Sequence, residues 1–398
     1  MYTSMFRKAM LGDTATLNID FTAGTVPTAV TFTRADTTAR ATYIDASGYV
    51  KTVAAAGDAR FDYVGGVAKG LLWEAAATNL LKHSAYANTN WLVYGLYSKS
   101  YTTGITSPAN DTTAAKISFG AVGNGLYTNN SQMGYTNTVG ATYTWSAWIR
   151  ATINTNNLNI RFGDSAAGLS PNIPITTTWT RYSYSYTAVT NSGPAIQSAS
   201  GSHTGEFEMW GFQLEQSTSP SSYINTTTAA LTRLADDAVI RSTAWTGLYS
   251  KPGSIVVEYY RGEYGAGDRS VLAIDTAATK HMHLKHANAS AASGIYNSAG
   301  TGVATKASGN ASGLNKAAFT WSSANPSVIK YALNGNATVV SATSDIGATL
   351  GTWMTIGSAS TTGVSGSGTW EGYLNNSIKS VKYYSELLSD AEMIAKTT

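Results

Sequence analysis

Cysteine is absent from this chain of 398 residues, and charged residues make up only 12% of it. Without cysteine the chain has no disulfide framework, no zinc–thiolate site and no cysteine nucleophile. Ordinary globular chains carry roughly 25% charged residues. The polar surface must therefore come mainly from threonine, serine, asparagine and glycine. The net charge is +3 and no basic run exceeds two residues, so nucleic-acid binding has little electrostatic support.

Long apolar runs are also missing. No window approaches the roughly 18 apolar residues that a membrane-spanning helix requires. The amino terminus does not resemble a secretory signal, because Arg7 and Lys8 interrupt its short apolar stretch. We expect a frayed tail or a single helical turn here. The alternative is a peptide that docks on another component of a particle through Met5, Phe6 and Met10.

Glycine, tyrosine and tryptophan are abundant, with 38, 24 and 10 residues. Short strands need many turns, and large aromatic side chains fill the cores of β-sandwiches. At about 150 residues per domain, the length fits two or three domains. We therefore predict an all-β fold, with an extended amino-terminal attachment segment followed by two antiparallel β-sandwich (jelly-roll) domains.

Turn signals divide the chain into four predicted parts: an attachment segment (1–78), a first sandwich (79–235), a linker (236–250) and a second sandwich (251–398). Alternating apolar and polar residues predict strands at Thr16–Phe21, Ala29–Thr33, Thr42–Ile44, Tyr49–Thr52, Ala115–Phe119, Thr142–Arg150, Leu158–Phe162, Thr178–Thr187, Glu206–Leu214, Ser254–Tyr260, Arg269–Asp275, Lys280–Lys285, Leu314–Trp321, Ser327–Leu333, Trp353–Gly357 and Ser377–Tyr384. The attachment segment has too few long apolar runs for a large core of its own. We expect it to lie against a neighbouring domain or another chain.

Two short motifs make local predictions. Asn334 and Gly335 lie between two strand patterns, and both residue types tolerate a positive φ, so they predict a hairpin turn. Ser389 and Glu392 have the spacing of a capping box, which predicts a short terminal helix.

Residues 205–240 carry the sharpest pattern. Glu206 and Glu208 share one face of a predicted strand, while Phe207 and Met209 share the other. The strand ends in aromatic-Gly-aromatic-Gln-Leu-Glu, followed by Ser-Tyr-Ile-Asn-Thr-Thr and Thr-Arg-Leu-Ala-Asp. This order resembles the end of a jelly-roll module of the carbohydrate-binding-module type in bacteriophage virion proteins. The resemblance extends over nearly all of the first predicted sandwich, through YTWSAWIRA and WTRYSYSYTA.

Two other segments resemble known families. Residues 32–81 resemble the amino-terminal segment of phage tail and head proteins, which implies attachment to the particle; the match departs at Trp73 and at 75–77. The closing WEGYLNNSIKSVKYYSELLSDAEM resembles the last strand and exit of concanavalin A-like (laminin-G-type) lectin domains. Because binding proteins and glycanases share that fold, the second resemblance implies no single activity.

Three of the five histidines lie close together in sequence. His281 and His283 fall on one face of a strand, and His286 could reach the same point from a following turn, which makes the three weak candidates for metal ligands. The alternative is an exposed edge strand, blunted by Lys280, Lys285 and the imidazoles.

Glu206 and Glu208 are the one pair of carboxylates whose spacing fits glycanase chemistry, at about 7 Å for a rise of roughly 3.3 Å per residue. Glycanases of the jelly-roll kind carry a motif that resembles Glu-x-Asp-x-x-Glu. In this chain no third acid follows Glu206 and Glu208 at that spacing. We therefore interpret the pair as a solvent-facing sheet edge. A nucleophile elbow and a phosphate-binding loop are absent too, so we predict that the chain is not an enzyme. No cofactor is predicted; a structural calcium ion fits such sandwiches, although no Asp-x-Asp-x-Asp loop supports one.

Aromatic clusters suit sugar binding, because sugars stack their apolar faces on aromatic rings while polar neighbours reach the hydroxyls. Most such side chains fill sandwich cores instead. The glycan-binding candidates come from two clusters, Trp91, Tyr94, Tyr97 and Tyr101 in the first sandwich, and Tyr264, Asp268 and Arg269 in the second.

The resemblances imply a non-enzymatic structural protein on the surface of a tailed phage particle, made in the host cytoplasm. It would be anchored by its amino terminus to capsid or tail proteins, would form a homo-oligomer such as a trimer, and would contact host polysaccharide or lipopolysaccharide as a tail fibre or receptor-binding protein. The first alternative is a capsid decoration or head fibre protein with a structural role. The second is a polysaccharide depolymerase.

Overall fold

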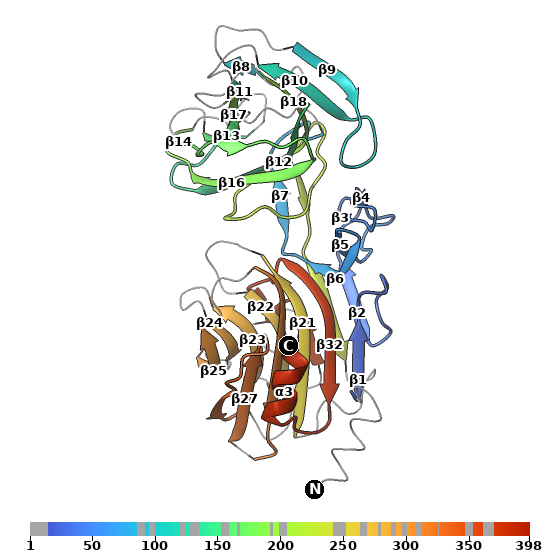
Figure 1. Cartoon of the computed structure of the whole chain (residues 1–398), viewed down its shortest axis with the longest axis vertical. Coiled ribbons are helices and arrows are strands. Elements are labelled where there is room, and N and C mark those ends of the chain that lie inside the picture. Colours follow the sequence, from blue (N-terminus) through green and yellow to red (C-terminus); the bar gives the residue numbers. More distant parts are fainter. Residues whose placement is uncertain are drawn as a thin grey trace. The chain divides into compact units, whose positions relative to one another are not determined.

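The fold is nearly all β, as the sequence predicts. The computed structural model (Figure 1) divides into two compact units, each built from separated segments. Unit 1 comprises residues 1–34, 57–75 and 235–398, and unit 2 comprises 35–56 and 76–234. The described residues are 15–85, 92–94, 100–119, 125–127, 135–152, 159–164, 168–191, 194–198, 205–241, 252–262, 269–277, 280–287, 292–296, 301–307, 312–324, 326–346, 353–360 and 370–398.

Unit 1 is built on two antiparallel sheets. The eight-stranded sheet has the order β28 (Val340–Ser344), β27 (Ser327–Leu333), β26 (Gly313–Trp321), β21 (Gly253–Arg261), β32 (Asn376–Tyr384), β6 (Val67–Trp73) and β5 (Phe61–Val64), and β1 (Leu17–Asp20) also pairs with β32. The seven-stranded sheet has the order β2 (Val30–Arg34), β20 (Asp236–Arg241), β29 (Trp353–Ile356), β22 (Arg269–Ala277), β23 (Lys280–Ala287), β24 (Ala292–Tyr296) and β25 (Gly302–Ala307).

One apolar core lies between these sheets. Alternate residues of each strand enter it, as the two-residue period of a strand requires, among them Ile255 and Val257 of β21 and Met282 and Leu284 of β23. The helix α3 (Asp390–Thr397) packs on the outer face of the eight-stranded sheet. A short ribbon joins β30 (Ala359–Ser360) to β31 (Trp370–Glu371).

Unit 2 contains the other sandwich, which the sequence analysis predicts as the first (79–235). Its five-stranded sheet has the order β16 (Thr180–Thr187), β12 (Thr142–Ala151), β18 (Gly205–Glu215), β10 (Ala114–Phe119) and β9 (Ser100–Ile105). Its six-stranded sheet has the order β14 (Gly168–Leu169), β13 (Asn159–Asp164), β17 (Pro194–Ser198), β11 (Gly125–Tyr127) and β8 (Leu92–Tyr94), with β15 (Ile173–Pro174) paired to β13. Two ribbons complete it, β3 (Thr42–Ile44) with β4 (Val50–Thr52) and β7 (Ala77–Asn79) with β19 (Leu231–Arg233).

The predicted alternation in unit 2 is confirmed. Tyr143 and Trp145 of β12 point into the core with Phe207 and Met209 of β18, while Trp148 joins a second cluster outside it. Tyr182, Tyr184 and Tyr186 share one face of β16, and this face lies against the core.

The described part of segment 1–78 lies against other parts of the chain, as the sequence analysis expects, and is not separate from them. Leu17–Asp20 pairs with β32 near the carboxyl end of the chain, and Val30–Arg34 pairs with β20. The predicted linker 236–250 also begins with a strand, because Asp236–Arg241 lies between β2 and β29. These short segments bury their apolar faces by completing the sheets of unit 1. The docking candidates Met5, Phe6 and Met10 lie outside the described residues.

Both local motifs are confirmed. Asn334 and Gly335 have φ values of 50° and 66°, and they begin a six-residue connection between β27 and β28. Ser389 caps α3, accepting a bond from the backbone of Glu392, whose side chain accepts in return from the backbone of Ser389. Among the described residues, no helix has the length and apolarity to cross a membrane.

Candidate functional site

The predicted glycan-binding residues do not form one described cluster. Tyr94 lies in β8 and Tyr101 in β9, which belong to different sheets of unit 2. Arg269 begins β22 and is partly exposed; burial, together with the positive charge of Arg261, lowers its pKa. The remaining candidates lie outside the described residues, namely Trp91, Tyr97, Tyr264 and Asp268.

The side chains of His283 and His286 do not converge. β23 is an interior strand between β22 and β24, so the edge-strand interpretation was wrong. His286 belongs to this strand, not to a following turn, and it points into the core opposite to His283. Its Nε2 lies 2.5 Å from the Tyr259 hydroxyl, and burial lowers its pKa to about 3. Among the described residues, no group of three or more His, Asp or Glu side chains could hold a metal ion.

The Glu206 and Glu208 pair is held by cations. Glu208 accepts from Arg150 Nε at 2.5 Å, and Glu206 lies 3.1 Å from Lys116 Nζ. β18 is an interior strand, so the two carboxylates lie on an open sheet face and not at an edge. The two carboxylates of a glycanase face each other across the scissile bond of the sugar, whereas these two lie side by side on one strand. Each is also neutralised by a cation, so they form a poor acid–base pair.

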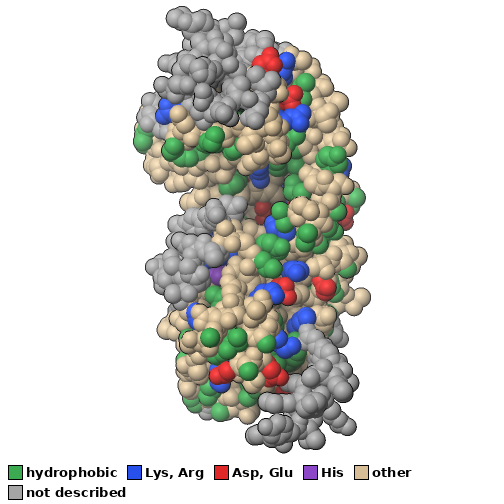
Figure 2. All heavy atoms as spheres, viewed as in Figure 1, with side chains coloured by type: hydrophobic (Ala, Val, Ile, Leu, Met, Phe, Trp, Pro, Cys, Tyr) green, Lys and Arg blue, Asp and Glu red, His purple; other side chains and the backbone are tan. Residues whose placement is uncertain are grey.

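These four side chains form what we call the charged row. Arg150 of β12 lies directly opposite Glu208 of β18, which lies directly opposite Lys116 of β10. The apolar residues next to Arg150, Glu208 and Lys116 in sequence point into the core, so the charged row occupies the outer face of the five-stranded sheet. Figure 2 shows acidic and basic side chains side by side on the surface of unit 2.

One tryptophan borders the charged row. The guanidinium carbon of Arg150 lies 4.8 Å from the ring centroid of Trp179, a partly exposed residue just before β16. A cation at this distance is attracted to the ring face, so Arg150 is fixed between Glu208 and Trp179. Trp179 also packs against the outer aromatic cluster and remains partly exposed. The row therefore places part of an aromatic ring beside donors and acceptors, groups that ligand sites combine. Trp179 is not among the aromatic candidates predicted from the sequence.

An aromatic cluster covers another part of this face. Trp148 and Trp210 pack against Tyr223, with ring centroids of Trp210 and Tyr223 4.6 Å apart. Gly211 interrupts β18 with a φ of 70° and produces a bulge. Trp210 stays on the outer side with Glu208, while Phe212, which strict alternation would place on that same side, turns into the core.

The motif after the bulge is a latch. Gln213 Oε1 accepts from the backbone of Ile224 at 2.7 Å, and Glu215 accepts from the backbone and hydroxyl of Ser221. Both side chains are buried. Burial raises the pKa of Glu215 despite these bonds and the nearby Arg181. The Gln-Leu-Glu and Ser-Tyr-Ile-Asn motifs thus hold the loop that seats Tyr223 on this face.

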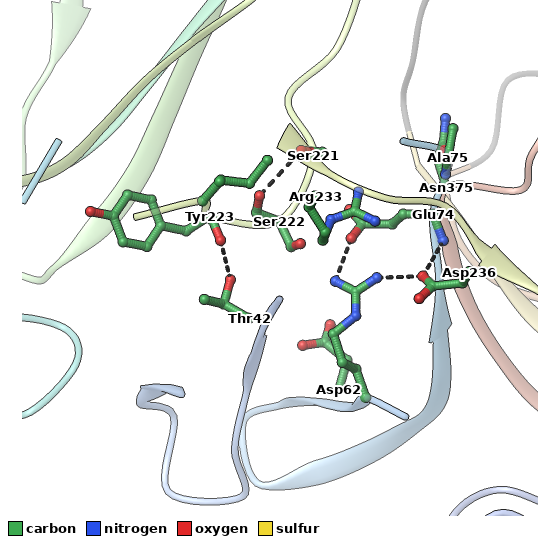
Figure 3. A network of polar contacts seen from close by, with 12 residues as sticks. Thr42, Asp62, Glu74, Ala75, Ser221, Ser222, Tyr223, Arg233, Asp236 and Asn375 are labelled. Atoms are coloured by element: carbon green, nitrogen blue, oxygen red, sulfur yellow. Dashed lines mark hydrogen bonds and ion pairs between the residues drawn. The ribbon is translucent and has the colours of Figure 1, made fainter. Parts of the chain in front are cut away.

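Unit 1 contains a buried ionic network. Arg60 donates to Glu74 and to Asp236, both at 2.5 Å, and Arg34 donates to Asp236 at 3.0 Å. Figure 3 shows the two carboxylates of this network, Glu74 and Asp236. Burial alone would lower the pKa of Arg60, but the two carboxylates raise it above its usual value. All four groups are buried and the charges balance, which indicates a structural role.

No protein-family model matches this chain, and no protein of curated function matches it. Solved structures that resemble it include the xylan-binding domain CBM22-1 of Paenibacillus barcinonensis Xyn10C, with TM-score 0.28, 10% identity, 36% of this chain and 96% of that one. The tandem CBM22-1–CBM22-2 of the same enzyme has TM-score 0.27 and 9% identity, covering 79% and 99%. Mouse laminin α1 domains LG4–5 have TM-score 0.23 and 11% identity, covering 71% and 91%.

Proposed function

We propose that the chain is a non-enzymatic glycan-binding protein, whose binding face is the charged row and Trp179. The observation that carries this proposal is the meeting of a partly exposed indole, two cations and two carboxylates on one outer sheet face of a β-sandwich. An indole supplies a stacking surface and the charged groups supply hydrogen bonds to hydroxyls.

The test is binding of the full chain to a polysaccharide panel by affinity electrophoresis. Trp179→Ala should weaken retardation by about tenfold, since loss of one stacking ring is worth about 1.5 kcal/mol. The matched control is Tyr49→Ala, another exposed aromatic of unit 2 with a cation, Lys51, over its ring. Equal affinity of the Trp179 variant and the parent protein would refute this site.

The phage setting rests on the sequence resemblances. In it, the protein is anchored on a tailed phage particle and contacts host surface glycans as a tail fibre or receptor-binding protein, and several weak sites in an oligomer add avidity. Gold-labelled antibody against the chain should decorate intact particles in electron micrographs, and the purified protein should bind host cells. Absence of label from intact particles would remove the virion assignment without touching glycan binding.

The alternative is a capsid decoration or head fibre protein with a structural role, which label on the head together with no binding to host fractions would favour. A depolymerase is the third candidate. It requires carboxylates other than Glu206 and Glu208, since a cation neutralises each of these. Release of reducing ends from host polysaccharide would favour it.

A further inference from the structure

The charged row alternates in sign across three strands. Arg150, Glu208 and Lys116 occupy directly opposed positions on β12, β18 and β10. Glu206 lies diagonally across from Lys116 and forms the second ion pair with it. Neighbouring positions on one sheet face are about 5 Å apart. The row therefore offers an acceptor beside a donor at each step.

Each cation of the row is matched by a carboxylate. The two ion-pair distances are 2.5 Å for Arg150 with Glu208 and 3.1 Å for Lys116 with Glu206. The row carries two positive and two negative charges, so its field falls off quickly with distance, and screening at physiological salt shortens its range further. An anionic ligand would gain attraction from each cation and lose it to the adjacent carboxylate.

The row is also accessible to a ligand. The side chains of Lys116 and Glu206 are 29% and 45% exposed, and that of Arg150 is 32% exposed. Thr102, opposite Lys116 on β9, is exposed as well and extends the row with a hydroxyl. A sugar hydroxyl both donates and accepts, so a paired cation and carboxylate satisfy it without leaving a charge unmatched.

We infer that the charged row selects neutral polysaccharides over acidic ones. This rests on the proposed glycan-binding function and names its ligand class: hydroxyl-rich chains without carboxylate, phosphate or sulfate groups. Vicinal hydroxyls of the sugar bridge the carboxylate and cation of one pair, while Trp179 at the Arg150 end supplies the apolar contact. An acidic sugar would place its charge against Glu206 or Glu208 at every register along the row.

The test compares matched polymers. The full-length chain is run in affinity electrophoresis against neutral glucans, xylans, mannans and galactans, and against the same polymers after carboxymethylation. The neutral form of at least one polymer should be bound more tightly than its carboxymethylated form. Its affinity should change little between about 50 and about 500 mM salt, since no net charge is neutralised on binding.

Two variants with opposite charge changes decide the matter. With a neutral ligand, Glu206→Gln and Lys116→Gln should each weaken binding by about fivefold, which corresponds to about 1 kcal/mol, the net contribution of a typical hydrogen bond. With an acidic ligand, Glu206→Gln would tighten binding and Lys116→Gln would weaken it. Both variants should fold, because exposed ion pairs contribute little to stability.

The outcomes separate the two proposals. Preference for carboxymethylated polymers, with tighter binding by Glu206→Gln, overturns the neutral-ligand inference and leaves glycan binding standing. Binding of neutral polymers that neither variant changes removes the charged row from recognition, and so also overturns the inference. Retention of no polymer in either form would count against the proposed function itself.

Discussion

His286 illustrates how burial changes the behaviour of a single residue. It lies in the core of unit 1, 2% exposed, beside the Tyr259 hydroxyl. Burial lowers its pKa from 6.5 to about 3, with a smaller contribution from the positive charge of Arg261. The folded protein therefore holds this imidazole neutral over a pH range in which the unfolded chain would take up a proton.

This difference predicts acid sensitivity. Because folding lowers the pKa, the stabilisation is complete above about pH 6.5 and is lost as the pH falls toward 3. At about 1.4 kcal/mol per pKa unit, unit 1 should lose about 2–3 kcal/mol between pH 7 and pH 4.5. Urea denaturation at a series of pH values measures this. His286→Gln should flatten the dependence, whereas His83→Gln in unit 2 should not; parallel curves for the parent and His286→Gln would contradict the prediction.

Strand periodicity already placed His281 and His283 on one face. The error concerned His286, because the predicted strand ended at Lys285, one residue before it, whereas β23 continues to Ala287. Once in the strand, a residue three positions from His283 must face the other way.

The sequence could predict only the two carboxylates of the charged row and not its two cations. The shared face of Glu206 and Glu208 follows from alternation, but their cations come from strands distant in sequence.

The bulge in β18 is the element that shapes the outer face of unit 2. A Cβ on Gly211 would lie 2.7 Å from Cε3 of Trp148, and the φ of 70° is unfavourable for any L side chain. Gly211→Ala should therefore destabilise unit 2 by about 2–4 kcal/mol, combining left-handed backbone strain with overpacking. Thermal unfolding followed by near-UV circular dichroism measures the loss.

Gly104 in β9 provides the matched control, since its φ is 79° but a Cβ there would meet no atom within 4 Å. Gly104→Ala should show the backbone strain alone, about 1–2 kcal/mol. Equal losses in the two variants would mean that the contact with Trp148 contributes nothing.

The resemblance marked Trp210–Glu215 as the end of a module, yet the latch it forms could not be predicted, because hydrogen bonds to a later loop leave no periodic signal.

At the scale of the whole molecule, the chain passes between the two units four times. The buried network in unit 1 draws its members from next to these crossings. Arg34 ends the first segment of unit 1, Arg60 and Glu74 lie near the two ends of the second, and Asp236 is near the start of the third. The sequence could not reveal this organisation, since Leu17 pairs with Tyr383 across nearly the entire chain. Contiguous boundaries drawn from turn signals miss sheets assembled from distant segments.

The network should hold these three segments together, and Arg60→Met tests it. Removing one member of a buried ionic group leaves the carboxylates of Glu74 and Asp236 without their main partner, which typically costs about 3–5 kcal/mol. Lys330→Met removes an exposed pair with Asp390 in the same unit, with side chains 36% and 54% exposed, and should cost under about 1 kcal/mol.

Hydrogen-exchange mass spectrometry distinguishes a local from a shared effect of Arg60→Met. If the network ties the segments together, amide protection should fall jointly in peptides covering β2, β6 and β20, because Arg34, Glu74 and Asp236 all lose their common geometry. A loss confined to the peptide that contains position 60 would show that Arg60 only fills space within its own segment. Protection of β12 and β18 in unit 2 should stay the same, since their core contains no member of the network.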